Sequence, residues 1–140
     1  MKLSIKRPLI AAAVGAAAFG LVTTVGTGPA AASGLATVSW WHNWDGPTYA
    51  GGNGTLEPLG EVLWSEDMQA DGWATRAQLQ YKDSSGNWHN TGGVCFDDTS
   101  TTGATKCDRS VAEGTPVRVH IWASKNGATR ASNYSNVVDA

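Results

Sequence analysis

The chain has 140 residues, with ten Lys and Arg against twelve Asp and Glu, so its formal net charge is −2 at pH 7. This balance argues against nucleic-acid binding, because neutralising phosphate groups requires clustered basic side chains. It argues equally against electrostatic docking to anionic lipid.

The first 32 residues have the organisation of a secretory signal peptide. Basic residues lie at positions 2, 6 and 7, an apolar run covers 9–25, and three consecutive alanines end at Ala32. A membrane anchor is the alternative, but Thr, Gly and Pro interrupt the run, which is short for a span of ~20 apolar residues. We therefore expect cleavage after Ala32 and secretion of one extracellular domain, residues 33–140, with no membrane attachment. Seven basic and twelve acidic residues remain in that domain, so its net charge is −5.

Short strands and turns fill the first part of this domain. Alternation predicts a strand within residues 33–43, which overlaps an aromatic-rich stretch from Trp40 to Trp44. Gly and Pro at positions 46 and 47 end it, and the Gly-rich residues 51–54 predict a flexible turn. A second strand is predicted at residues 59–65, with a polar connection after it.

Two runs alternate more clearly than any others. In residues 73–81 the odd positions are Trp, Thr, Ala, Leu and Tyr, whereas the even positions are Ala, Arg, Gln and Gln. Residues 117–123 place aliphatic side chains on one face and Arg118, His120 and Trp122 on the other. Successive side chains of a strand point to opposite faces, so both runs predict half-buried strands, and we expect them to pair antiparallel. The predicted core comprises Trp73, Ala77, Leu79, Val117, Val119 and Ile121. Alternation in the strand within residues 33–43 adds Trp40.

The rest of the domain also indicates strands. A turn at residues 83–86 precedes a returning strand, residues 94–96 continue the sheet, and residues 125–127 signal another hairpin before a last strand at 134–138. No segment has the apolar spacing of a helix outside the signal. Six or seven short strands in about 100 residues predict an all-β fold, a single antiparallel β-sandwich.

The domain has two cysteines, Cys95 and Cys107. Export places them in an oxidising compartment, where such a pair normally forms a disulfide. The bond would close a hairpin-like loop at residues 96–106 and stabilise the fold by on the order of 3 kcal/mol. Their separation does not fit a Cys-x-x-Cys metal or redox motif.

The sequence of the predicted C-terminal strands resembles that of known domains. Residues 113–123 read Glu-Gly-Thr-Pro-Val-Arg-Val-His-Ile-Trp-Ala, and after a Gly turn residues 135–138 read Ser-Asn-Val-Val. This order resembles the last two strands of fibronectin type III and related immunoglobulin-like domains. The Gly-Trp-Ala-Thr-Arg-Ala strand at 72–77 also resembles small secreted proteins of high-GC bacteria. The resemblance implies an immunoglobulin-like sandwich but no activity, because that fold hosts many functions. The cysteines depart from it, since they lie close in sequence, unlike the sheet-to-sheet disulfide of antibody domains.

The sequence favours a protein that is not an enzyme. It lacks the Gly-x-Ser-x-Gly, Ser-x-x-Lys and His-Glu-x-x-His motifs, and its Glu residues are scattered over different segments. The three histidines are interpreted as polar strand positions. Asp97 and Asp98 could offer oxygen ligands to calcium, but they lack the ordered spacing of calcium loops. We predict no cofactor and no metal, with a weak calcium site at these two residues as an open alternative.

Seven tryptophans are many for a domain of this size, and two of them fall on polar faces. Trp122 shares its face with Arg118 and His120, and Trp41 falls with Thr and Ser. An apolar ring on a polar face indicates either local covering or a binding surface. The leading hypothesis is a module that binds extracellular glycan or cell-wall material. A protein-interaction or inhibitor function of the disulfide loop is the alternative, and a small hydrolase is the least favoured. The predicted binding residues are Trp122, His120, Arg118, Arg76, Gln78, Gln80 and Trp41.

Overall fold

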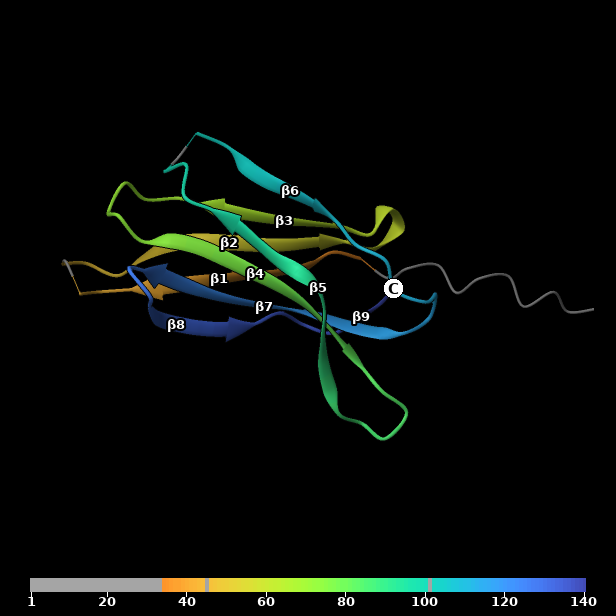
Figure 1. The fold of residues 1–140 in the computed structure, drawn as a ribbon. Coiled ribbons are helices and arrows are strands. Elements are labelled where there is room, and N and C mark those ends of the chain that lie inside the picture. The colour runs from red at the N-terminus through yellow and green to blue at the C-terminus, as the bar shows by residue number, and fades with distance from the viewer. Residues whose placement is uncertain (1–33, 45, 101) are drawn as a thin grey trace, which may run out of the picture.

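The structure is a computed structural model, which describes residues 34–44, 46–100 and 102–140. Two antiparallel sheets pack face to face, and the hairpin of β4 and β5 extends beyond them (Figure 1). The prediction of an all-β sandwich is confirmed. The expected signal peptide lies outside the described residues. Within those residues, no helix is long and apolar enough to cross a membrane.

The chain passes repeatedly between the two sheets. The first sheet has the order β1-β2-β3-β6, and the second has the order β5-β4-β7-β8, with β9 pairing β7. The first sheet contains β1 (Ala36–His42), β2 (Tyr49–Glu57), β3 (Val62–Asp67) and β6 (Ala104–Asp108), and the 3-10 turn η1 (Pro58–Gly60) precedes β3. The second contains β4 (Ala74–Lys82), β5 (Trp88–Asp97), β7 (Pro116–Lys125), β8 (Ala128–Tyr134) and β9 (Val138–Asp139).

The core lies between the sheets and follows the predicted parity. β4 and β7 pair antiparallel as expected, with Ala77 opposite Ile121 and Leu79 opposite Val119. These four side chains and Val117 are fully or almost fully buried, and burying each aliphatic one contributes roughly 1.5–3 kcal/mol. Trp73 differs slightly, because it precedes β4 and only its partly buried ring packs against the core.

Trp40 explains why residues 51–54 do not form the predicted turn. These residues lie within β2, and the indole of Trp40, which is 1 % exposed, packs on them. A Cβ atom on Gly51 would lie 1.9 Å from Trp40 Cη2. Trp40 Nε1 also donates a hydrogen bond to Thr75 Oγ1 of the second sheet, at 2.9 Å. The glycines therefore make room for a side chain that crosses the interior.

Strand boundaries differ from the predictions at three further places, and the first is the predicted loop 96–106, whose last residues form the start of β6. β3 begins only at Val62, because Pro58 starts a 3-10 turn in the predicted strand. The predicted last strand, 134–138, is divided between the end of β8 and the start of β9. The chain leaves β8 at Tyr134 and returns to β7 at Val138.

The disulfide between Cys95 and Cys107 is confirmed, but it does not close a hairpin. Cys95 lies in β5 of the second sheet, and Cys107 lies in β6 of the first, with their Cα atoms 5.9 Å apart. β6 pairs with β3 rather than with β5. The expectation that this bond differs from a sheet-to-sheet disulfide is therefore wrong, because closeness in sequence does not keep two strands in one sheet.

Replacing both cysteines by alanine should lower the free energy of unfolding by on the order of 3 kcal/mol. Because the bond joins the two sheets, we expect the loss in the global transition, measured by urea denaturation with tryptophan fluorescence. An unchanged transition, with faster hydrogen exchange confined to residues 96–106, would contradict this expectation.

Candidate binding surface

The outer face of the second sheet brings most of the predicted binding residues together. In the β4–β7 register, Arg76 lies opposite Trp122 and Gln80 lies opposite Arg118. His120 points to the same face, because it alternates with the buried Val119 and Ile121. The side chains of these five residues are half-buried, so they form a packed surface that solvent still reaches.

Aromatic and guanidinium groups on this face stack in one series. The guanidinium carbon of Arg118 lies 4.1 Å from the ring centroid of Trp88 and 4.2 Å from that of Tyr134. The His120 ring lies 4.6 Å from Tyr134 and 4.7 Å from Trp122, centroid to centroid. We call the series Trp88, Arg118, Tyr134, His120 and Trp122 the stacked ladder. Exposed cation–π contacts contribute roughly 0.5–1 kcal/mol each.

Polar contacts hold the ladder in place. Gln80 accepts a hydrogen bond from Arg118 Nε at 2.9 Å and donates one to Asn90 Oδ1 at 2.9 Å. His120 Nε2 lies 2.7 Å from Ser132 Oγ. Burial, and then the positive charge of Arg118, hold the pKa of His120 below its usual range, so the ring is neutral at pH 7.

Stacking determines which ring faces are free to bind. Arg118 and His120 each have aromatic groups on two sides, so they offer mainly their edges. Trp122 is the last member of the ladder and has His120 on one face. The other end, Trp88, has Lys82 Nζ 5.8 Å from its ring centroid. Trp122 is therefore the ladder member best placed to stack on a ligand.

Gln78 and Trp41 do not belong to this surface. Gln78 is only 5 % exposed, and its Nε2 donates to the carbonyl oxygens of Thr91 and Gly92, at 2.7 and 3.1 Å, where the β4–β5 register shifts. It satisfies the backbone of an irregular strand, so its predicted exposure is wrong. Trp41 is 57 % exposed, but it lies in β1 of the first sheet.

Three aromatic residues of the surface were not predicted. Trp88 and Phe96 lie in β5, and Tyr134 ends β8. Alternation in residues 94–96 could have indicated Phe96, because it neighbours the inward-facing Cys95. The positions of Trp88 and Tyr134 beside Arg118 depend on three strands meeting, which no local pattern specifies.

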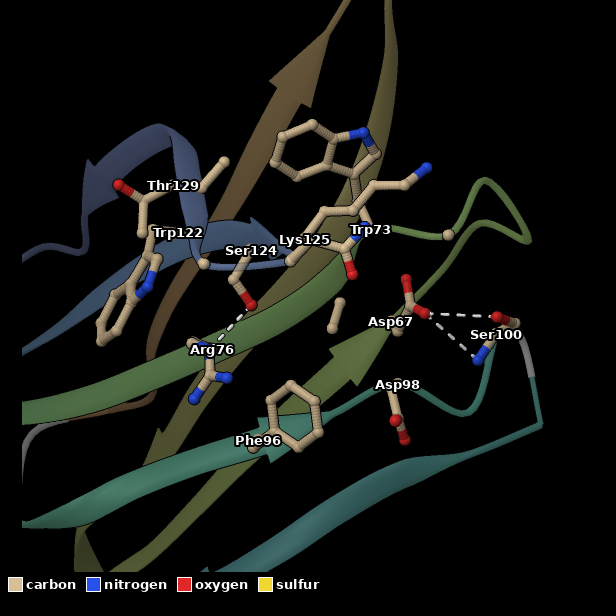
Figure 2. Close-up of a pocket in the computed structure, with 15 residues that line it drawn as sticks. Asp67, Trp73, Arg76, Phe96, Asp98, Ser100, Trp122, Ser124, Lys125 and Thr129 are labelled. Atoms are coloured by element: carbon tan, nitrogen blue, oxygen red, sulfur yellow. Dashed lines mark hydrogen bonds between the residues drawn. The ribbon is translucent and has the colours of Figure 1, made fainter.

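A groove of about 620 Å³ opens at the Trp122 end of the ladder. Figure 2 shows its side chains, with Arg76 between Ser124 and Phe96. Arg76 Nε donates to Ser124 Oγ at 2.7 Å, and its guanidinium carbon lies 4.4 Å from the Phe96 ring centroid. The labelled lining residues are Asp67, Trp73, Arg76, Phe96, Asp98, Ser100, Trp122, Ser124, Lys125 and Thr129.

Two buried aspartates hold the wall opposite Trp122. Asp97 accepts hydrogen bonds from the backbone N–H of Asp67 at 2.7 Å and from the hydroxyls of Thr99 and Thr105 at 2.9 and 3.1 Å. Asp67 Oδ2 accepts hydrogen bonds from the backbone N–H and hydroxyl of Ser100, at 3.2 and 3.4 Å. These contacts fix the loop after β5. Because they engage the Asp97 carboxylate, it is poorly suited to bind calcium, and the described residues contain no cluster of three potential metal ligands.

A second aromatic cluster supports the groove at Trp73. The Trp44 ring lies 5.2 Å from Trp73, and Arg130 lies over both rings, at 5.4 and 5.1 Å. Buried His42 stacks on Trp44 at 4.3 Å, and its Nε2 lies 3.4 Å from Asp71 Oδ2. The cluster fixes Trp73 as a rigid wall of the groove.

Comparisons of the chain with protein families, with curated proteins and with solved structures find no match. The chemistry of the groove therefore carries the functional argument.

The raised pKa of Asp67, a residue of this wall, predicts that the free energy of unfolding depends on pH. Burial raises the pKa of Asp67 from 3.8 to about 6. Its contribution to stability is therefore complete below pH 3.8 and is lost as the pH rises through about 6. The loss should be on the order of 3 kcal/mol. Urea denaturation at a series of pH values should show this slope, and Asp67→Asn should remove it.

Asp83→Asn is the matched control. The backbone N–H of Asn87, followed by His89, lowers the pKa of Asp83 to about 2, so this carboxyl contributes stability above pH 3.8 that is lost toward pH 2. The slope between pH 4 and 7 should therefore persist in this variant. Its persistence in the Asp67→Asn variant would contradict the assignment to Asp67.

Proposed function

We propose that this protein is a secreted, non-enzymatic binding module with an immunoglobulin-like fold, and that it binds extracellular glycan or cell-wall material. Two strand pairs support the fold proposal. β3 pairs with β6 and β4 pairs with β7, so each sheet joins strands distant in sequence. The B–E and C–F pairs of immunoglobulin-type sandwiches have the same relation.

The observation that carries the functional proposal is the position of Trp122 at the end of the ladder and at the wall of the groove. A sugar ring has an apolar C–H face and a polar rim. The indole can receive the apolar face, while Ser124, Thr129 and Lys125 offer hydroxyl and ammonium groups to the rim. The volume of about 620 Å³ is within the usual range of small-molecule sites.

The side chains of the groove are already held in place, so a ligand can bind without rearranging them. Trp122 is backed by the ladder, and Arg76 is held by Ser124 and Phe96. Side chains already ordered in the free protein lose less conformational entropy when a ligand binds. A sugar gains from this preorganisation, because each of its contacts with the protein contributes little free energy.

Trp122→Ala should weaken binding to the polysaccharides retained by the wild-type protein by about 30-fold or more, as for an aromatic hot-spot residue. A glycan array followed by affinity electrophoresis measures this loss. The fold should persist, because the ring lies outside the core.

Trp41→Ala is the matched control, since it removes the same side chain from the other sheet. It should bind like the wild-type protein. Lower thermal stability of the Trp122→Ala variant with unchanged binding would show that Trp122 has a structural role and that the ligand site is elsewhere. Binding of a protein partner, with no glycan retained, would favour the interaction function instead.

A further inference from the structure

The cations of the domain gather on the second sheet. Residues 34–140 contain seven Lys and Arg, and five of them lie in its strands, namely Arg76, Lys82, Arg118, Lys125 and Arg130. The same strands contribute only two carboxylates. Asp97 is buried, and Asp139 lies in β9. An otherwise acidic domain therefore presents a basic face, which attracts anions.

Arg76 has the most specific environment among these cations. Its side chain is half-buried, and the hydrogen bond to Ser124 is the only one it makes to the described residues. No carboxylate of those residues lies within 4 Å of its nitrogens. A partly desolvated guanidinium without an anionic partner leaves favourable interactions unmade. Because Nε is anchored, the two terminal nitrogens remain as donors at the groove (Figure 2).

We propose that the ligand of the groove is an acidic polysaccharide, and that Arg76 binds the carboxylate of one of its uronic acid rings. This inference rests on the proposed glycan-binding function. The planar guanidinium matches a carboxylate with two parallel hydrogen bonds, which Lys cannot reproduce.

The strand register places stacking and charge recognition side by side. Arg76 and Trp122 are opposed residues of β4 and β7, and such pairs have Cβ atoms roughly 4.5–5.5 Å apart. A pyranose ring stacked on Trp122 therefore directs a carboxylate on its edge toward Arg76. Asp67 and Asp98 lie across the groove from Trp122, so the carboxylate is oriented away from that wall (Figure 2).

Matched polymers separate charge recognition from sugar recognition. Polygalacturonate, alginate and hyaluronan are each compared with their methyl esters, which keep the backbone and lose the charge, in 0.15 M salt. The wild-type protein should bind at least one acid about tenfold or more tightly than its ester. Arg76→Gln should abolish this preference, whereas Trp122→Ala should weaken binding of acid and ester alike.

Two further variants and two polyanions complete the experiment. Arg76→Lys should keep only part of the preference, and Lys82→Gln, which removes a cation of the same strand outside the groove, should keep all of it. Melting temperatures verify that the variants are folded. Equal affinity for every acid and its ester would overturn the inference and leave glycan binding intact. Absence of binding to any of these polymers and to neutral glycans would refute the proposed function itself. Equally tight binding of dextran sulfate and DNA, unaffected by Arg76→Gln, would also overturn the inference.

Discussion

The outer surface depends on the register of β4 against β7. This register sets Arg76 opposite Trp122 and Gln80 opposite Arg118 while it buries the aliphatic residues between them. A slip by one residue would turn the core side chains outward, so the hydrophobic effect that stabilises the sandwich also fixes the chemistry of its surface. The core and the outer face are two consequences of one strand pairing.

Several links that cross the sandwich keep this arrangement rigid, among them the hydrogen bond from Ser65 Oγ in β3 to the carbonyl oxygen of Thr75 in β4. Trp40 reaches from β1 to Thr75, and the disulfide joins β5 to β6. A further link is the hydrogen bond that the backbone N–H of Asp67 in β3 donates to the carboxylate of Asp97 in β5. The last two both involve the end of β5, which leads into the loop that forms one wall of the groove. The groove is therefore shaped by both sheets, although Arg76, Phe96 and Trp122 belong to the second.

The sequence alone was sufficient to predict which side chains are buried where a strand has one buried face. Alternation in residues 73–81 and 117–123 predicted the core and five surface residues, because burial imposes a period of two. It failed for Gln78, because the backbone of β5 covers this side chain where the β4–β5 register shifts. It also failed for the Gly-rich part of β2, since glycine indicates a turn and a close contact equally well. The partners of Arg118 come from β5 and β8, and only the assembled sheet brings them together.

The most direct test of the account is to follow the seven tryptophan indole N–H signals by NMR while oligosaccharides of galacturonate, alginate and hyaluronan are added in turn. Binding at the end of the ladder should shift the signal of Trp122 and the Nε–H signal of Arg76. The signals of Trp41 and Trp64, which lie in the first sheet, should stay unchanged. Shifts confined to Trp41 and Trp64, or no shift at any indole with any of the three acids, would contradict the account.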